Sequence, residues 1–483
     1  MQIYSNKKVF ITGHTGFKGS WLSLYLHALG AKIYGYALKP HTTPNHFDLL
    51  ESEKFITKSY YADINDYQSL ECAIESSNPD IIFHLAAQPL VRRAYREPLY
   101  TLSTNAIGSA NLLNAARKSP NLKAIVMITT DKVYENKEWL YPYRENDTLG
   151  GYDPYSASKA CAEIIIDSMR ASFFNITDFG KSHNVLIASA RAGNVIGGGD
   201  WSEDRLIPDL IRGYINHSPT LIRYPDATRP WQHVLEPLRG YLLLGAKLLH
   251  RRKEYATSFN FGPENEGNIN VSEVLHRAKT LWNQLSFHIQ KDPNAPHEAN
   301  FLMLDSTKAR KMLHFTPIWN SLDSIKHTIT WYKSLYESHT LLSHAQLEEY
   351  IKASKVSNGG GGTQHNKTHN LAQTPYNFFI LFAPPTKTFT NSTIFTDFAH
   401  TFTLDSTILD SSFSANQNLT IYLNSYINSL TLKNHIHIHT YNNPNNNPNC
   451  ATSSQNLCLL FAHNDSINTP ECIPKYQNLK SIA

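Results

Sequence analysis

The chain has 483 residues, enough for one two-lobed globular unit of about 340 residues and a further segment. Its 44 Lys and Arg against 40 Asp and Glu leave a formal net charge of only +4, dispersed along the sequence, which argues against a nucleic-acid partner. No apolar run approaches the about 18 residues of a membrane span, and strand-type sequence begins almost at Met1, so we expect a cytoplasmic protein without signal peptide or membrane anchor.

The first predicted elements are a strand over 8–12, a glycine-rich loop over 13–19 and a helix over 20–29. The loop reads G-H-T-G-F-K-G, and its three glycines let the backbone approach a pyrophosphate at the N-terminus of the helix. Such a loop alone could be an ordinary turn, but the strand before it and the helix after it favour a dinucleotide site. The residues expected to contact the dinucleotide are Gly13, Thr15, Gly16, Phe17 and Gly19.

The second predicted strand, over 32–37, leaves the choice of dinucleotide open. It ends in Leu38-Lys39-Pro40, without the acidic residue that usually binds the ribose 2′-hydroxyl of NAD. A lysine at this point could instead favour the 2′-phosphate of NADP.

A buried strand over 124–128 leads into Thr129-Thr130-Asp131-Lys132. Ligands of open α/β sheets bind beyond the carboxyl ends of the strands, which is where this segment is predicted to lie. An acid beside an amine near a redox centre can add and remove protons from a transiently oxidised substrate. The alternative is that Asp131 only hydrogen-bonds its own turn.

Tyr155 and Lys159 are predicted to lie four residues apart on one face of a helix. The ammonium would favour the phenolate and lower a tyrosine pKa that is ordinarily about 10. A phenolate beside a sugar hydroxyl can take its proton as hydride leaves. An exposed Tyr and Lys on a surface helix is the alternative.

The order and spacing of these motifs resemble the extended, nucleotide-sugar-modifying branch of the short-chain dehydrogenase/reductase superfamily, over roughly residues 3 to 335. The segments 84–88 and 104–109 add to the resemblance. It implies an α/β fold with a Rossmann-type doubly wound parallel sheet, an NAD-binding domain over 1–190 and a smaller substrate lobe over 191–340. It also implies a homodimer, paired through the helices that follow Thr104 and Tyr155. Further NAD contacts that it implies are Asp63, Ile64, Leu85, Ala86, Ala87, Asn105, Tyr155 and Lys159. Asn105 is equally a candidate helix cap.

Within this superfamily the chain resembles the 4,6-dehydratases that act on CDP-glucose. The segment 130–132 reads Thr-Asp-Lys, where dTDP-glucose enzymes have Thr-Asp-Glu, and the segments 191–201 and 229–234 agree with the CDP-glucose branch. The resemblance implies formation of CDP-4-keto-6-deoxyglucose for deoxysugars of surface polysaccharides such as lipopolysaccharide O-antigen. The alternatives are another nucleotide-sugar 4,6-dehydratase, an epimerase, or a relative that binds NAD and nucleotide sugar without turnover. An epimerase has no acid at the position of Asp131.

The expected chemistry assigns the catalytic residues Thr130, Asp131, Lys132, Tyr155 and Lys159. Hydride leaves C4 of the sugar, and the ketone acidifies the C5 proton. Lys132 would remove that proton, which requires a neutral amine, while a partly protonated Asp131 would protonate the departing C6 hydroxyl. Hydride then returns to C6, so no external oxidant is consumed.

Four later residues are candidates for binding the substrate. The Asn194 amide and the guanidinium groups of Arg205 and Arg229 suit a sugar diphosphate, by hydrogen bonding and by charge. Trp231 could close the nucleotide pocket, although a core position is the commoner place for a tryptophan. Surface positions for the arginines are the alternative. We expect no metal site, and the isolated Cys72 and Cys161 to be core residues.

The composition changes beyond a predicted helix end and glycine linker over 341–362. From 363 to 483 the sequence is rich in Asn, Thr and Ser and contains no Gly, Val, Arg, Met or Trp. All codons for these five contain guanine, so we hypothesise that Gly359–Gly362 are encoded by a slippery poly-G tract and that the following segment is read in a shifted frame. A second domain behind a flexible linker, with strands over 378–382 and 419–423, is the alternative. Metal binding by His435, His437 and His439 is disfavoured.

Overall fold

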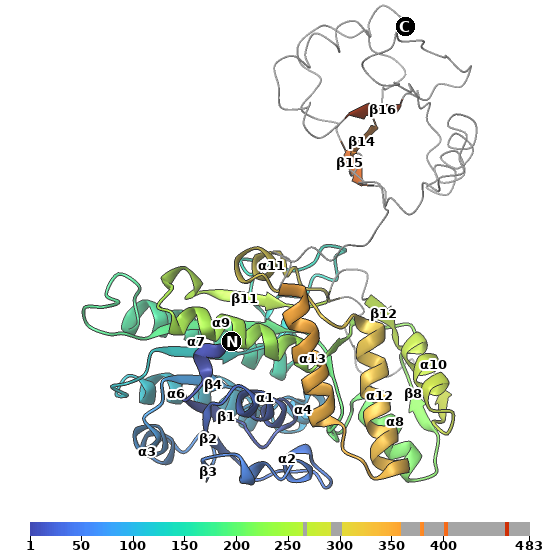
Figure 1. Cartoon of the computed structure of the whole chain (residues 1–483), viewed down its shortest axis with the longest axis horizontal. Coiled ribbons are helices and arrows are strands. Elements are labelled where there is room, and N and C mark those ends of the chain that lie inside the picture. The colour runs from blue at the N-terminus through green and yellow to red at the C-terminus, as the bar shows by residue number, and fades with distance from the viewer. Residues whose placement is uncertain (264–267, 291–301, 359–376, 381–399, 404–458, 463–483) are drawn as a thin grey trace, which may run out of the picture. The chain divides into compact units, whose positions relative to one another are not determined.

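The structure is a computed structural model that describes residues 1–263, 268–290, 302–358, 377–380, 400–403 and 459–462. The chain divides into two compact units between Gly361 and Gly362 (Figure 1). The glycines 359–362 and most of the segment 363–483 lie outside the described residues.

The first unit is built on a seven-stranded parallel sheet with the order β11-β6-β5-β4-β1-β2-β3. Its strands are β1 (Lys8–Thr12), β2 (Lys32–Ala37), β3 (Lys58–Tyr61), β4 (Ile81–His84), β5 (Ala124–Ile128), β6 (Leu186–Ala192) and β11 (Ser258–Phe261). The strand order reverses between β1 and β4, which is where doubly wound sheets bind their ligands. Strands β4, β5, β6 and β11 are buried at every residue, as strands covered by helices on both faces must be.

Helices cover both faces of the sheet (Figure 1). Phe10, on one face of β1, packs in the core that holds α3 (Tyr67–Ser77), α6 (Gly108–Ala116) and α7 (Pro154–Phe173). Val9 and Ile11 point to the opposite face, where the core holds α1 (Phe17–Ala28), α9 (Leu235–Leu249), α12 (Ser321–Ser338) and α13 (Ser343–Asn358). The Rossmann-type α/β fold class is confirmed.

Shorter elements complete the first unit. They include small two-stranded sheets that pair β7 (Val195–Ile196) with β10 (Gln232–His233), β8 (Thr220–Ile222) with β13 (Phe287–Ile289), and β9 (Thr228–Pro230) with β12 (Asn268–Asn270). The shorter helices are α2 (His46–Leu49), α4 (Val91–Arg96), α5 (Pro98–Leu102), α8 (Leu206–Ile215), α10 (Val271–Leu281) and α11 (Thr307–Leu313), with a π-helical turn over Ser103–Ile107. The predicted lobe boundary at 190/191 falls inside β6, and β11 and α9 return to complete the first sheet and its covering. Residues on both sides of position 190 therefore belong to the same sheet and to the helices that cover it.

The second unit has three described strands, β14 (Asn377–Ile380), β15 (His400–Thr403) and β16 (Leu459–Ala462). β14 lies between the other two and pairs with both in antiparallel register. The predicted strand over 378–382 agrees with β14 for residues 378–380. The predicted strand over 419–423 and the histidines 435, 437 and 439 lie outside the described residues.

The prediction that Cys72 and Cys161 are core residues is wrong, because both are exposed. On α3 the residues that face the core are Leu70, Ala73 and Ile74, and Cys72 points to the opposite side of the helix. Helix α7 likewise buries residues 158, 159, 162 and 163 and leaves Cys161 outside.

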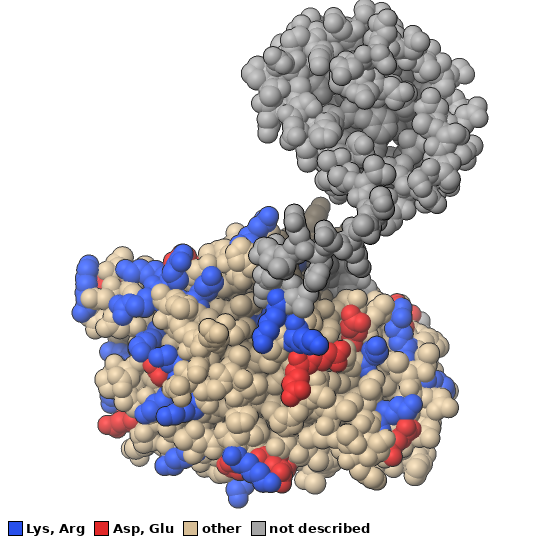
Figure 2. Space-filling view, viewed as in Figure 1, with Lys and Arg blue, Asp and Glu red and all other residues tan. Residues whose placement is uncertain are grey.

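Among the described residues no helix is long and apolar enough to cross a membrane. Lys and Arg are interspersed with Asp and Glu over the face seen in Figure 2.

Candidate active site

The glycine-rich loop joins β1 to α1 and is packed so tightly that side chains would not fit. Gly13 has φ +77°, and a Cβ there would lie 2.8 Å from the Ala86 backbone nitrogen. A Cβ on Gly19 would lie 2.0 Å from the Gly13 carbonyl oxygen. Thr15 Oγ1 donates to the Leu38 carbonyl at 2.8 Å, which fixes the loop against the end of β2. The predicted strand, loop and helix are therefore present, and Gly16 stands at the N-terminus of the helix.

The other predicted cofactor residues lie at the ends of neighbouring strands. Leu85 and Ala86 follow β4, and their backbone N–H groups donate to Thr12 Oγ1 at 3.2 and 3.1 Å. Asp63 follows β3, and its carbonyl accepts from the Tyr36 hydroxyl at 2.9 Å. Ile64 is buried and packs in the core cluster that includes residues of α6. Ala87 is half-buried in the loop after β4.

Asn105 is neither a helix cap nor exposed. It lies in the π-helical turn over Ser103–Ile107 and is buried. Its amide donates to the Gln88 carbonyl at 3.0 Å and to Ser158 Oγ at 2.8 Å, while its oxygen accepts from the Gln88 N–H at 2.8 Å. Asn105 thus joins the loop after β4 to the helix that carries Tyr155. The helix-cap alternative is wrong because Asn105 bonds residues of other segments of the chain and does not bond the first turn of a helix.

Asp131 begins a 3₁₀ turn over Asp131–Val133 at the carboxyl end of β5. Thr130 caps this turn, and its hydroxyl donates to Asp131 Oδ1 at 2.9 Å. Asp131 is buried, and burial raises the pKa of its carboxyl, against the opposing effects of Lys132, Arg229 and Lys18. The expected shift toward a protonated acid is confirmed in direction.

Tyr155 and Lys159 lie in the first turns of α7, which Asp153 caps by accepting the Ser156 N–H at 3.0 Å. Both side chains are buried. Burial raises the pKa of Tyr155 to about 12, and a hydrogen bond with Thr130 only partly offsets it. Burial also lowers the pKa of Lys159 to about 8, opposed by the carboxylate of Glu163. The predicted lowering of the tyrosine pKa below 10 is therefore wrong, because desolvation of the phenolate outweighs the nearby positive charge.

Lys18 is a site residue that the sequence reading missed. It is the second residue of α1, it is half-buried, and its pKa is lowered to about 8 by burial first and by Arg205 next. Asp131 and Lys159 also act on its charge, so the ammonium lies in the same site. Its place between Gly16 and Gly19 was the available signal, but a lysine in a glycine-rich loop does not by itself reveal which way it points.

The predicted substrate residues reach the site to different degrees. Arg205 lies 3.5 Å from the buried Asp200 carboxylate, and Arg229 is close enough to oppose the raised pKa of Asp131. Asn194 is half-buried and follows Gly193, where a Cβ would lie 2.9 Å from Asp131 Oδ2. Trp231 is buried in the core and its indole N–H donates to the Ile269 carbonyl at 3.1 Å. Trp231 is therefore a core residue, as the alternative to a role in the nucleotide pocket predicts.

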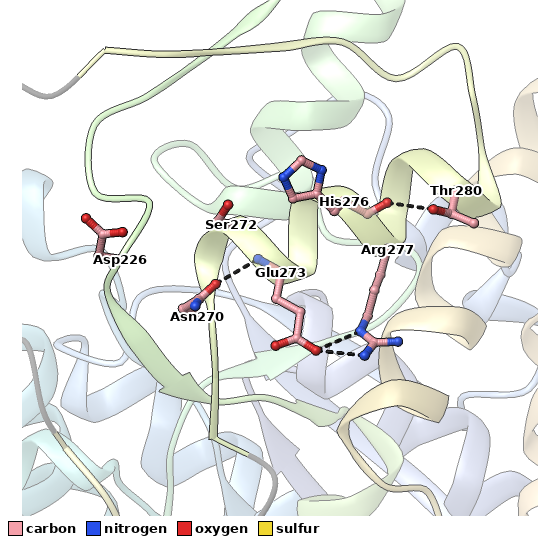
Figure 3. Close-up of a pocket in the computed structure, with 7 residues that line it drawn as sticks. All are labelled: Asp226, Asn270, Ser272, Glu273, His276, Arg277 and Thr280. Carbon is pink, nitrogen blue, oxygen red and sulfur yellow. Dashed lines mark hydrogen bonds and ion pairs between the residues drawn. The ribbon is translucent and has the colours of Figure 1, made fainter.

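A pocket of about 530 Å³ lies elsewhere, around the first turns of α10 (Figure 3). Its polar side chains engage one another: Glu273 pairs with Arg277 at 2.7 Å, and Asn270 accepts the Glu273 N–H at 2.8 Å. Its lining residues are Asp226, Asn270, Ser272, Glu273, His276, Arg277 and Thr280. None of them is a predicted site residue. Within the described ranges, no group of His, Cys, Asp and Glu could hold a metal ion.

Comparisons with known proteins identify a family and several relatives that this chain is similar to. A family model described as GDP-mannose 4,6 dehydratase matches residues 10–328. The chain is 43% identical over 352 residues to CDP-glucose 4,6-dehydratase of Salmonella typhimurium, a match that covers 72% of this chain and 98% of that protein. It is 26% identical over 290 residues to a UDP-glucose 4-epimerase of Mycoplasma pneumoniae, covering 57% of this chain and 83% of that protein.

Two solved structures show the same fold. The epimerase Mth375 from Methanothermobacter thermautotrophicus superimposes with a TM-score of 0.59 at 21% identity, over 70% of this chain and 95% of that one. MoeE5, in complex with UDP-glucuronic acid and NAD, superimposes with a TM-score of 0.57 at 22% identity, over 67% of this chain and 98% of that one. Both likenesses concern the arrangement of the sheet and its helices.

Proposed function

The chain belongs to the GDP-mannose 4,6 dehydratase family, and we propose that it converts CDP-glucose into CDP-4-keto-6-deoxyglucose with an internally recycled NAD. The observation that carries this proposal is the buried Asp131 carboxyl, with its raised pKa, beside Lys132 and close to Tyr155. A carboxylic acid whose pKa is raised can protonate a departing hydroxyl group so that it leaves as water, which a simple 4-epimerisation does not need. The 43% identity to the Salmonella CDP-glucose enzyme supports the choice of nucleotide.

The loop between β1 and α1 fits the pyrophosphate of NAD. A Cβ on Gly13 or Gly19 would collide with the backbone of Ala86 or Gly13, so only glycine allows this tight loop, and the helix N-terminus that follows it suits a negative charge. The residues proposed to hold NAD are Gly13, Thr15, Gly16, Phe17, Gly19, Asp63, Ile64, Leu85, Ala86, Ala87, Asn105, Tyr155 and Lys159. When bound, NAD would accept the C4 hydride and later return it to C6. Because the same hydride is returned, no other redox partner is required.

We assign the proton steps to the residues at the ends of β5 and α7. Tyr155, hydrogen-bonded with Thr130 and one helical turn before Lys159 on α7, takes the proton of the C4 hydroxyl in its phenolate form as hydride leaves, after its own proton has passed to solvent. Lys132 then removes the C5 proton while Asp131 protonates the C6 hydroxyl, and water departs from C5–C6. The hydride is then returned to C6, and a proton added to C5 completes the reaction. Asn194, Arg205 and Arg229 are proposed to hold the sugar diphosphate, and we leave Trp231 to the core.

The function can be tested with the purified full chain. Incubation with CDP-glucose should give the alkaline absorbance of a 4-keto-6-deoxy sugar, and parallel reactions with dTDP-glucose and GDP-mannose test the nucleotide. A C4 epimer as the only product would support the epimerase alternative. If none of the three substrates gives any product, the protein is not the enzyme that we propose.

The rate should stop rising with pH at about 8, because above that pH the gain of the Tyr155 phenolate, whose pKa burial raises to about 12, is offset by the loss of the Lys159 ammonium. Burial lowers the pKa of Lys159 to about 8, so its ammonium is present below that pH and is lost above it. The raised pKa of Asp131 keeps its acid form to higher pH than for an ordinary aspartate, and that form too is lost as pH rises. Measuring kcat/KM from about pH 6 to 10, with a circular dichroism check of folding, gives the profile. A rate that keeps rising through about pH 9.5 would contradict these roles.

We propose a homodimer formed through the helices that follow Thr104 and Tyr155, which are α6 and α7. The two helices pack together, and their neighbourhood leaves Leu99, Ile107 and Ile164 with 80, 53 and 58% of their surface exposed. Light scattering after size exclusion should give twice the chain mass, and Ile164→Asp should give the single-chain mass. Ile215→Asp, at an exposed position of α8, is the matched control and should stay dimeric. An unchanged mass for Ile164→Asp would exclude this surface.

The segment beyond residue 362 is proposed to be dispensable for this chemistry. The Salmonella relative is matched over 98% of its length by 72% of this chain, so that relative has no counterpart for about a quarter of the sequence. The shifted-frame hypothesis for 363–483 stays a prediction, and sequencing the codons for Gly359–Gly362 in single clones tests it. A fixed, interrupted set of glycine codons would exclude it. The cytoplasmic location and the use of the product for surface polysaccharide also stay predictions.

A further inference from the structure

A buried ion pair lies directly behind the catalytic residues. Glu163 stands one helical turn after Lys159 on α7, and Arg191 lies on β6, next to β5 in the sheet. Arg191 Nε donates to Glu163 Oε1 at 3.0 Å and Arg191 Nη2 donates to Glu163 Oε2 at 2.8 Å. The exposed fractions of the two side chains are 0% for Glu163 and 2% for Arg191, so neither can touch the substrate.

The pair is bonded to both ends of the segment that carries the proposed acid and base. On the β5 side, Thr129 Oγ1 donates to Glu163 Oε1 at 2.5 Å. On the other side, Arg191 Nη1 donates to the Tyr134 hydroxyl at 2.9 Å, and the guanidinium carbon lies 5.1 Å from the centre of the Tyr134 ring. Thr130, Asp131 and Lys132 lie between these two attachments.

Further hydrogen bonds hold the pair itself in place. Ser189 Oγ donates to Glu163 Oε2 at 2.8 Å, and Arg191 donates to the Glu145 carbonyl at 3.0 Å and to Ser258 Oγ at 3.2 Å. The Tyr134 hydroxyl donates onward to Asn260 Oδ1 at 2.7 Å. A buried ion pair is costly unless its remaining donors and acceptors are satisfied, and here they are. The result is a rigid polar cluster that joins α7, β5, β6 and β11.

We propose that Glu163 and Arg191 are positioning residues that fix the Thr130-Asp131-Lys132 segment relative to Tyr155 and Lys159. This inference rests on the proposed function. The reaction requires one set of residues for C4 oxidation and another for water elimination, acting on neighbouring carbons of one bound sugar. A displacement of about 1 Å between reacting groups can cost about 100-fold in rate. Holding both ends of the acid–base segment to the helix that carries Tyr155 and Lys159 prevents such a displacement.

The test cuts one attachment at a time and leaves the proposed catalytic side chains intact. Thr129→Val removes the hydroxyl that bonds Glu163, and Tyr134→Phe removes the hydroxyl that bonds Arg191. Thr129→Ser keeps the first bond, and Ser189→Ala removes a bond to the same carboxylate without touching the segment. The full chain, loaded with NAD, is mixed rapidly with CDP-glucose. Nicotinamide absorbance then reports C4 oxidation, and the keto sugar reports the completed reaction.

For Thr129→Val and Tyr134→Phe we expect product formation to slow by about tenfold or more, with reduced nicotinamide accumulating because elimination is slowed more than oxidation. In Thr129→Ser and Ser189→Ala, the level of reduced nicotinamide relative to the keto sugar formed should be the same as in the unaltered protein. Equal slowing of both steps, or the same accumulation in Ser189→Ala, would overturn the positioning role. Thermal unfolding shows whether each variant is folded, and Tyr134→Phe, which removes the other attachment, still tests the proposal if Thr129→Val is not folded. If the unaltered protein gives no keto sugar, the proposed function fails, and the positioning role fails with it.

Discussion

Lys132→Ala is expected to stop the reaction after the first step. Without the amine, the C5 proton has no base, so the 4-ketone forms but water is not eliminated. The loss of a general base typically costs about 10²–10⁴-fold in rate, and we expect the formation of keto sugar to fall by that factor. Hydride cannot return to a carbon that still carries its hydroxyl group. It can go back only to the C4 ketone, so reduced nicotinamide should persist at the level set by the C4 equilibrium, which a single-turnover absorbance measurement detects.

Two comparisons sharpen this experiment. Lys137→Ala changes a partly exposed lysine five positions later, whose ammonium lies over the Trp139 ring, and it should leave both steps unchanged. If Lys132→Ala eliminates water at the normal rate, the base lies elsewhere. Lys18 is then the next candidate, because its amine lies close enough to Asp131 to affect its charge and has a pKa lowered to about 8. Lys18→Ala would then show the stalled reaction instead.

Much of the site is visible in the sequence because its pieces are encoded locally. The apolar runs of β1 and β5, the three glycines after β1 and the Tyr-x-x-x-Lys spacing each depend on a few neighbouring residues. A parallel sheet places the ends of such strands at one edge, so the prediction that Asp131 lies in the same site as Tyr155 needed only the fold class. The raised pKa of Asp131 follows from the same placement, because the end of a buried strand is poorly solvated.

The features that the sequence did not predict depend on packing between distant segments. The pKa of Tyr155 is set mainly by burial, which the spacing to Lys159 does not reveal. Lys18 belongs to the site because α1 begins beside Asp131. Asn105 is bonded to Gln88 and Ser158 from two other elements, and Trp231 packs in the core behind the site. Except for Lys18, these residues are candidates from the sequence alone, and what the sequence does not reveal is the residues that surround them in the fold.

Tyr155→Phe is expected to block the first step itself. Burial keeps the phenol protonated in the ligand-free protein, with a pKa of about 12, and the hydrogen bond with Thr130 and the charge of Arg205 favour the phenolate that the proposed proton removal at C4 requires. Phenylalanine keeps the buried ring and its packing but offers no atom to take the C4 proton. We expect C4 oxidation to slow by about 10²–10⁴-fold, with no reduced nicotinamide and no keto sugar. Tyr152→Phe, at an exposed position just before α7, is the matched control.

The two variants predict opposite states of the cofactor, and that contrast decides the order of events. If C4 oxidation precedes elimination, Lys132→Ala should hold the nicotinamide reduced and Tyr155→Phe should hold it oxidised, although neither makes product. A Lys132→Ala/Tyr155→Phe double variant should then behave like Tyr155→Phe, because a blocked first step conceals the second. Reduced nicotinamide in the double variant would mean that Tyr155 is not the base for C4 oxidation. The Thr130 hydroxyl, which hydrogen-bonds with Tyr155 and Asp131, would then have to carry the proton alone.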